Sequence, residues 1–370
     1  MLETSFLYDL PNLIFCLITV FIVGAWAKLP KNILIILIGH CFVPFFLNDF
    51  LFSAMLFGDQ FRYTSAVHEI RQDWDLVTQI GNVANASWML SAIPLPLVET
   101  VKSLGFFNKF LLIVTFGFLY KRGVLNNFSA YFFLLYPSVV LYTGLSLRDT
   151  LILCYMLIGT YFAVKRNFIL VIFWLAPLWF IKFQNLLIML PIVFYVVFNI
   201  GKKGMSPRSG GVFIVCLLAA LIASFPIAAP MINEFRLAMY REDGGANIED
   251  VELISGIGSF IYMGLTSGFY FFVKPLPWES AKAFQFIQSL ENLFIMYLIF
   301  KLTIKAWKNN TRQLMFWLVL FVSSMSIYGL VVFNYGTAAR YRFPFVLIYV
   351  IFVCYSCNIK NVFDRKSNFK

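Results

Sequence analysis

Long apolar stretches, separated by short clusters of lysine and arginine, recur along nearly the whole chain. Of its 370 residues, 61% are hydrophobic and only 13% are charged. A helix needs roughly 20 apolar residues to cross a bilayer, so these stretches predict an all-α, polytopic membrane protein. We expect a single integral membrane domain over residues 1–370. Because Met1–Asp9 contains no lysine or arginine, we expect the first span to insert uncleaved.

The apolar stretches predict about eleven transmembrane helices. They cover residues 12–28, 32–52, 106–120, 128–144, 149–165, 168–182, 185–199, 211–231, 284–305, 313–335 and 342–360. The basic clusters between them then share one side, which the positive-inside rule makes the cytoplasm. The N-terminus is therefore expected outside, and the basic tail 361–370 inside. Only Asp364, among 18 acidic residues, falls on the cytoplasmic side, so polar chemistry is expected on the external face.

Two external segments are long, at residues 53–105 and 232–283. Within the first, apolar Ser87–Leu97 is too short to span the membrane. Within the second, Ile257–Val273 would invert every later loop if it crossed. We expect both to be amphipathic or re-entrant pieces in the interface. The glycines of the second piece fit a segment that is not a simple span: Gly256, Gly258, Gly264 and Gly268.

Other classes of function are disfavoured. The net charge of +11 could suggest nucleic acid, but the lysines and arginines form short clusters between spans, so no nucleic acid is expected. All six cysteines lie in predicted spans, and Cys354-x-x-Cys357 lacks a second ligand pair. No metal site is therefore predicted. The sequence contains no phosphate-binding loop, Rossmann fingerprint or metalloprotease motif.

The first candidate site follows the second predicted span. Asp59 is placed near the outer membrane surface, where a carboxylate can take a proton from a sugar hydroxyl. If the next segment is helical, Tyr63 shares a face with Asp59, and Arg62 lies beside them. His68, one of only two histidines, is the alternative base. The structural alternative is a solvated, charged loop.

Two more candidates interrupt apolar runs on the external side. Arg148-Asp149 suggests the floor of a polar pocket. A helix start would explain Asp149, but not Arg148, because a cation is disfavoured at a helix N-terminus. Lys182 lies at an external hairpin, against the usual charge bias, so we regard it as an anion contact. A simple hairpin between spans is the alternative.

The last candidates precede and begin the final span. Arg340 and Arg342 lie at an external rim, where arginine forks match the phosphate or diphosphate of a lipid. Glu291 is expected inside the ninth span, where an acidic residue is a functional candidate by default.

These pieces, in this order, resemble lipid-linked glycosyltransferases of the GT-C type and Wzy-type O-antigen or exopolysaccharide polymerases. The resemblance covers roughly residues 10–360, and the absence of a large C-terminal soluble domain favours the compact polymerase-like group. The segments that carry it are Gly58-Asp59 through Tyr63, Tyr136-Pro137-Ser138 leading to Arg148-Asp149, Lys274-Pro275-Leu276-Pro277-Trp278-Glu279 leading to Glu291, and Asn334-Tyr335-Gly336-Thr337 leading to Arg340-Tyr341-Arg342-Phe343-Pro344.

The resemblance implies a site at the outer face of the bacterial cytoplasmic membrane, with Asp59 as the acidic residue of the first external loop. The expected substrates are a polyprenyl-linked glycan donor and acceptor, beside membrane lipid. A chain-length regulator and a flippase are the protein partners to expect. No cofactor is expected, and a divalent metal stays open. The alternatives are a GT-C transferase that uses a polyprenyl-phosphate sugar to decorate a lipid or glycan, and a lipid-linked glycan transporter.

Overall fold

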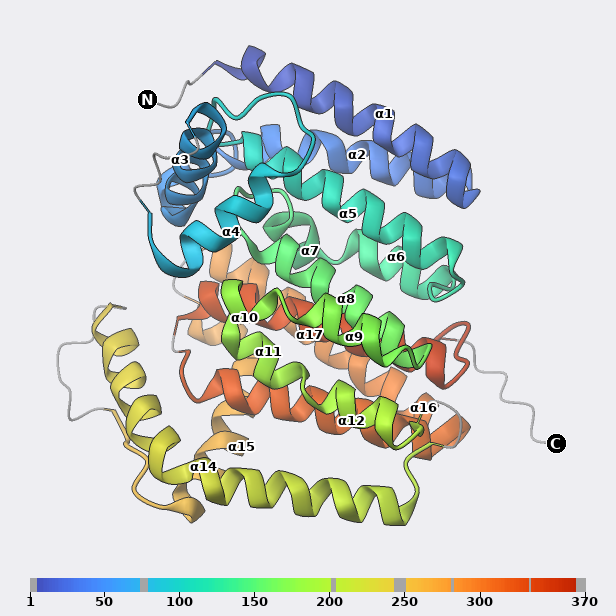
Figure 1. Ribbon diagram of the computed structural model, residues 1–370, viewed down its shortest axis with the longest axis vertical. Coiled ribbons are helices and arrows are strands. Elements are labelled where there is room, and N and C mark those ends of the chain that lie inside the picture. The colour runs from blue at the N-terminus through green and yellow to red at the C-terminus, as the bar shows by residue number, and fades with distance from the viewer. Residues whose placement is uncertain are drawn as a thin grey trace. The chain divides into compact units, whose positions relative to one another are not determined.

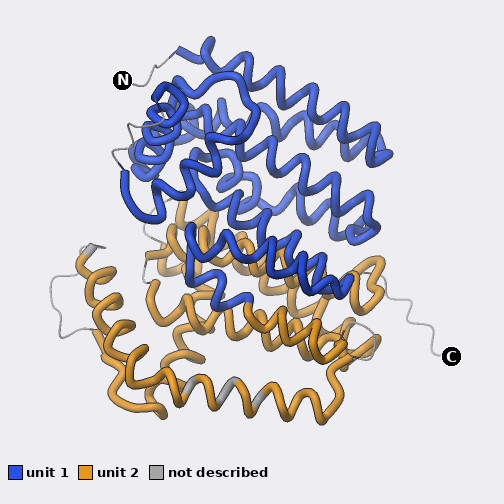
Figure 2. Tube along the Cα trace, viewed as in Figure 1, with its two compact units in different colours: residues 1–189 blue, residues 190–370 orange. Residues whose placement is uncertain are grey.

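The computed structural model describes residues 5–73, 79–200, 204–242, 251–280, 283–332 and 334–363. All the regular secondary structure in these ranges is helical, which confirms the all-α prediction. The chain forms two compact units, Met1–Met189 and Leu190–Lys370 (Figure 2).

The first unit consists of helices packed side by side, with shorter helices at their ends (Figure 1). Its elements are η1 Phe6–Asp9, α1 Leu10–Ala27, α2 Lys31–Leu47, η2 Ala54–Phe57, α3 Asp59–Gln72, α4 Gly81–Ser91, α5 Ser103–Lys121, α6 Asn127–Leu135, α7 Pro137–Tyr142, α8 Asp149–Val164, α9 Phe168–Leu175, α10 Leu178–Ile181 and α11 Phe183–Met189.

Proline explains where the predicted spans break. The predicted span 128–144 divides into α6 and α7 at Pro137, and 168–182 divides into α9 and α10 at Pro177. Proline has no N–H to donate and its ring clashes with the preceding turn, so each helix ends before it. Pro137 and Pro177 are then placed at helix starts, where a missing donor costs nothing.

The second unit contains longer helices. They are α12 Pro191–Val197, α14 Pro207–Glu242, α15 Ile257–Val273, η4 Pro277–Glu279, α16 Ala283–Gly329 and α17 Tyr335–Ser356. Within α16 the backbone is non-helical at Asn310 (φ −158°, ψ 81°), and the Asn310 side chain accepts a bond from the Gln313 N–H at 3.1 Å. The predicted spans 284–305 and 313–335 are thus two successive helices with a capped break between them.

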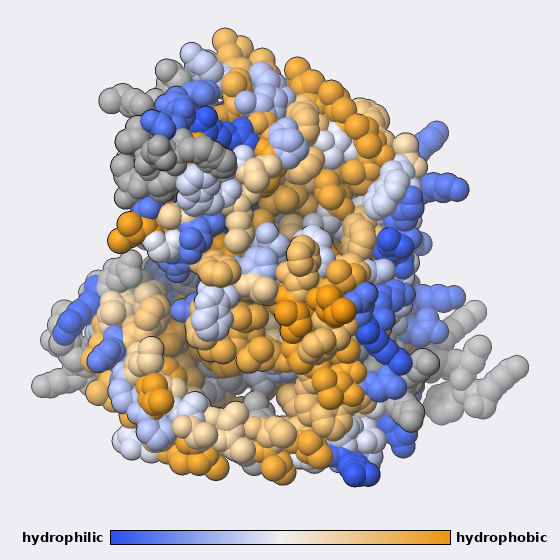
Figure 3. All heavy atoms as spheres, in the orientation of Figure 1, coloured by the Kyte–Doolittle hydropathy of each residue, from blue (hydrophilic) through white to orange (hydrophobic). Residues whose placement is uncertain are grey.

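Within the described ranges, four helical segments are long and apolar enough to cross a membrane: Phe6–Ala27, Ser103–Lys121, Ala283–Gly329 and Tyr335–Ser356. The expected number of about eleven spans is not confirmed. Apolar side chains also cover much of the visible surface (Figure 3). On α1, for example, Ile18, Phe21 and Ile22 are each more than half exposed. In a bilayer such side chains lie against lipid rather than water.

The basic turns of the first unit gather at one end. The α1–α2, α5–α6 and α8–α9 connections lie on the same side of this unit, and α3 and α4 lie on the other (Figure 1). The residues of these turns are Lys28 and Lys31, Lys121 and Arg122, and Lys165 and Arg166. This arrangement is the one that the positive-inside rule requires of a common cytoplasmic face.

The second unit has a similar basic end. The Arg312 carbonyl accepts from the Met205 N–H at 2.9 Å, and the Lys305 Nζ donates to the Asn361 carbonyl at 2.6 Å. The break in α16 therefore lies beside the segment that precedes α14 and the segment that follows α17.

Glycines let α15 and α16 approach closely. A Cβ on Gly268 would lie 2.7 Å from Ser326 Cα, and one on Gly329 would lie 2.4 Å from the Ser267 carbonyl oxygen. Gly258 has no atom within 4 Å of such a Cβ. The inner glycines of Ile257–Val273 are therefore explained by helix packing, since small residues bring two backbones together. The segment itself is one regular helix.

Candidate functional site

The α3 helix begins at Asp59 and lies at the end of the first unit away from the basic turns (Figure 1). The Asp59 side chain is 45% exposed, and its Oδ1 lies 3.9 Å from Arg62 Nη1. The N–H groups and dipole of a helix N-terminus stabilise a carboxylate. Tyr63, one turn later, is buried. Because this segment is helical, Asp59 and Tyr63, four residues apart, share a face.

Arg148 joins the second candidate to the first. Its guanidinium carbon lies 5.7 Å from the centre of the Tyr63 ring, and its Nη1 donates to the Ile181 carbonyl at 2.9 Å. Lys182, the buried residue that follows Ile181, ends α10. Asp149 begins α8 and is buried. The structure thus brings Tyr63, Arg148, Asp149 and the Lys182 turn into one neighbourhood.

The segment between α7 and α8, which leads into Arg148, is irregular but buried, so its backbone polar groups need partners. Asn108 Nδ2 donates to the Leu145 carbonyl at 2.6 Å and to the Leu147 carbonyl at 2.8 Å. The Ser146 N–H donates to Gln60 Oε1 at 3.1 Å. These bonds fix the segment that places Arg148. Sequence reasoning missed Asn108, although an amide inside an apolar helix is itself a signal.

His68 does not join this group. It follows Asp59 by nine positions on α3, which at 3.6 residues per turn is half a turn out of phase and about 13 Å along the axis. Its Nδ1 lies 2.6 Å from the Val98 carbonyl oxygen and 3.7 Å from Glu99 Oε2. A carbonyl only accepts, so Nδ1 carries the proton and Nε2 is the basic nitrogen of the neutral ring. Asp59 and His68 thus lie in separate environments.

Arg71, three residues on, organises the expected interfacial piece Ser87–Leu97. Its Nη1 donates to the Leu95 carbonyl at 2.6 Å, its Nε donates to the Ser91 carbonyl at 3.2 Å, and its guanidinium lies over the Phe107 ring. The piece is therefore the last turns of α4 followed by irregular backbone bound to an arginine. The local sequence around Arg71 does not predict this role, because the carbonyls that Arg71 binds are 20 or more residues away in the sequence.

A buried lysine was also missed. Lys109, on α5, is fully buried, and its Nζ lies 3.2 Å from His40 Nδ1, 3.1 Å from the Val140 carbonyl and 2.9 Å from Thr143 Oγ1. Three acceptors match the three donors of an ammonium group. His40 Nε2 lies 2.7 Å from the Leu134 carbonyl, so Nε2 carries the proton and Nδ1 accepts. This cluster anchors the same α7–α8 region.

In the second unit, Arg342 is buried and contacts the end of α15. Its Nη1 donates to the carbonyls of Phe271 at 2.9 Å and Phe272 at 2.6 Å, and its Nη2 donates to Asn292 Oδ1. Asn292 Nδ2 in turn donates to the Lys274 carbonyl at 2.9 Å. The last carbonyls of a helix have no partner within it, so Arg342 and Asn292 cap α15. These hydrogen bonds give Arg342 a structural role.

Arg340 and Glu291 are both half-buried. The Arg340 guanidinium carbon lies 5.8 Å from the centre of the neighbouring Tyr341 ring. The predicted start of the last span, residue 342, is wrong. The helix α17 begins at Tyr335, because the Asn334 side chain caps it by accepting from the Gly336 N–H at 2.8 Å. Both arginines therefore lie inside a helix rather than in a loop before it.

The chain was compared with protein-family models, with curated proteins and with solved structures, and none of them matches it. Among the residues that the structure describes, no group of three or more His, Cys, Asp and Glu side chains is placed to hold a metal ion.

Proposed function

We propose that this protein is a membrane glycosyltransferase of the polymerase type, with a GT-C-like arrangement of about eleven spans. It joins polyprenyl-diphosphate-linked oligosaccharide units on the outer face of a bacterial cytoplasmic membrane. The observation that carries the proposal is the placement of an exposed carboxylate, Asp59, one helical turn from Tyr63, with the Arg148 guanidinium against that ring. The α3 helix, which carries Asp59 and Tyr63, lies at the end of the first unit opposite its basic turns (Figure 1).

The arrangement suits glycosyl transfer. A hydroxyl oxygen of the acceptor sugar attacks the anomeric carbon of the donor, and its proton passes to the Asp59 carboxylate. The bond from that carbon to the diphosphate oxygen breaks, and polyprenyl diphosphate leaves with the bonding electrons. The charge that develops on the leaving oxygen needs nearby cations. In the proposed reaction Arg148 supplies this positive charge, and Arg62 and Lys182 are further phosphate contacts.

The candidate residues of the second unit have different roles. Arg340 stays a proposed phosphate contact, and Glu291 a proposed polar contact to the glycan. Arg342 is assigned to the cap of α15, because its donors are used by backbone carbonyls and Asn292. His68 stays the alternative base, in its separate environment beside Glu99.

The test is Asp59→Asn in purified protein in lipid, with polymer formation and donor binding measured in parallel. The swap is nearly isosteric and removes the proton acceptor, so the rate should fall on the order of 10²–10⁴-fold while donor binding persists. Asp49→Asn is the matched control, since Asp49 is an exposed carboxylate that is paired with Lys102 at 3.2 Å. Wild-type activity in Asp59→Asn would exclude it as the base and move the role to His68.

A further inference from the structure

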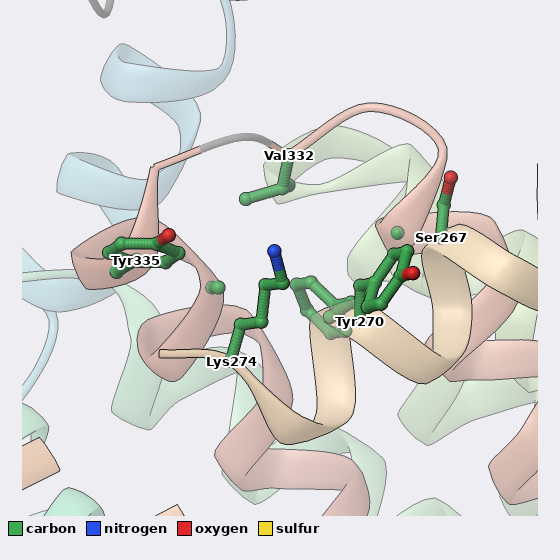
Figure 4. Close-up of a pocket in the computed structure, with 8 residues that line it drawn as sticks. Ser267, Tyr270, Lys274, Val332 and Tyr335 are labelled. Atoms are coloured by element: carbon green, nitrogen blue, oxygen red, sulfur yellow. The ribbon is translucent and has the colours of Figure 1, made fainter. Parts of the chain in front are cut away.

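The second unit contains a cavity of about 250 Å³ between α15, α16 and the start of α17. No residue of this cavity has a part in the proposed reaction. Figure 4 shows the Lys274 side chain rising between the Tyr270 and Tyr335 rings, with its nitrogen turned into the cavity. The lining residues are Ser267, Tyr270, Phe271, Lys274, Gly329, Val332, Tyr335 and Ala338.

The charge of Lys274 is balanced at the site. Its Nζ lies 3.0 Å from Glu279 Oε1 and 4.8 Å from the centre of the Tyr270 ring. Glu279 Oε2 also accepts from the Leu276 N–H at 3.0 Å. The bond to Glu279 raises the pKa of Lys274, and the bond from the Leu276 N–H lowers the pKa of Glu279, so both groups are charged at neutral pH. Such a pair offers hydrogen-bond donors and acceptors. Because its two charges cancel, it attracts an anion only weakly.

Hydrogen bonds and close helix packing hold the walls of the cavity. Arg342 and Asn292 fix the backbone that carries Lys274, through the carbonyls at the end of α15. On the opposite wall, Gly329 lies so close to Ser267 that no Cβ fits between them. A preformed cavity avoids the entropic cost of ordering its own side chains when a ligand binds.

We propose that this cavity binds one uncharged sugar ring. A sugar ring has apolar C–H faces, which pack on aromatic rings, and a rim of hydroxyls, each a donor and an acceptor. Among the lining residues, the rings of Tyr270 and Tyr335, the Lys274 side chain and the Ser267 hydroxyl match both features. Ligand pockets commonly measure about 300–1,000 Å³, so this smaller cavity fits a single ring rather than an oligosaccharide. The choice of a sugar rests on the proposed function, and the site deepens it by adding a glycan-holding position.

The test measures how fast an amine-acetylating reagent modifies Lys274 in nanodiscs prepared without sugar-headed detergent. The probes are D-glucose, D-galactose, D-mannose, N-acetylglucosamine, N-acetylgalactosamine and inorganic phosphate, at equal concentration and ionic strength. At least one neutral sugar should slow the modification, roughly ten-fold at about ten times its Kd. Phosphate should not. Lys301 is the control, since its Nζ lies 5.5 Å from the centre of the Tyr297 ring, outside the cavity; its rate should not change.

Stronger protection by phosphate than by every sugar, or no protection by any probe, would overturn the proposal. Ala338→Leu fills the cavity and should abolish the protection, with helix content by circular dichroism as the check on folding. The readout needs no turnover, so it separates the two proposals: if Asp59→Asn keeps full activity, the proposed base fails, and protection of Lys274 is still measured independently.

Discussion

Arg342→Lys offers the sharpest separation of a structural from a phosphate-binding arginine. The buried guanidinium serves two carbonyls at the end of α15 through Nη1 and Asn292 through Nη2. Lysine keeps the charge but not the planar fork, and one ammonium cannot reach these separated acceptors in the same geometry.

The expected loss in the free energy of unfolding follows from the hydrogen-bond acceptors that Arg342→Lys leaves without a donor. Phe271 and Phe272 lie in the last turn of α15, where carbonyls have no donor inside the helix. Each buried acceptor that loses its partner costs about 1–3 kcal/mol. If lysine still serves one of the three acceptors, two are lost, so the free energy of unfolding should fall by about 2–6 kcal/mol.

The assay is equilibrium unfolding in a sodium dodecyl sulfate titration, followed by far-ultraviolet circular dichroism. Arg340→Lys is the matched control: Arg340 is half-buried and stacks beside Tyr341, so its loss should cost less than about 1 kcal/mol. Equal unfolding free energies for the two variants would refute the capping role. A stable Arg342→Lys protein with lost activity would instead make Arg342 the phosphate contact that the sequence first suggested.

Three further predictions follow from the same contacts and from the charge pattern. Gly329→Ala should destabilise the protein by about 1–3 kcal/mol, because its Cβ has no room, whereas Gly258→Ala should stabilise it by about 0.5–1 kcal/mol; unfolding titrations compare the two, and equal effects would contradict the close helix crossing. The Lys274–Glu279 pair should show a coupling of about 0.5–1 kcal/mol in a double-mutant cycle between pH 4.5 and 10.5, the ordinary pKa values of the two groups. The coupling should be lost as pH falls through the lowered pKa of Glu279 or rises through the raised pKa of Lys274, and a coupling that ignores pH would exclude an ion pair. A cysteine placed at Lys366 should resist an impermeant reagent in intact spheroplasts, and its labelling would reverse the topology.

The fold could be predicted from the sequence as far as its local signals reach. The length of the apolar stretches predicts where most helices lie. The charged residues around Asn310 predict the break in α16. The splits at Pro137 and Pro177 do not follow from apolar length, because they come from the missing proline N–H. The start of α17 lies before the predicted residue 342, because the Asn334 cap and not apolar length sets where this helix begins.

The candidate site was predictable in its parts but not in its assembly. Helical spacing correctly put Tyr63 on the face of Asp59. The approach of Arg148 to Tyr63 joins residues 85 positions apart in the sequence, and no local pattern encodes such a contact. The same limit hid the role of Arg342, whose partners on α15 precede it by about 70 residues. An arginine fork suits carbonyls as well as phosphate, so composition alone could not choose between them.

The most direct test of the proposed polymerisation of lipid-linked glycan units is to measure the lipid-linked glycan of cells that lack this protein. We expect single repeat units to accumulate on the polyprenyl diphosphate and polymer to disappear. Full-length polymer that lacks one side sugar would support the decorating transferase instead. Unchanged polymer, with no lipid-linked intermediate accumulating, would contradict the account.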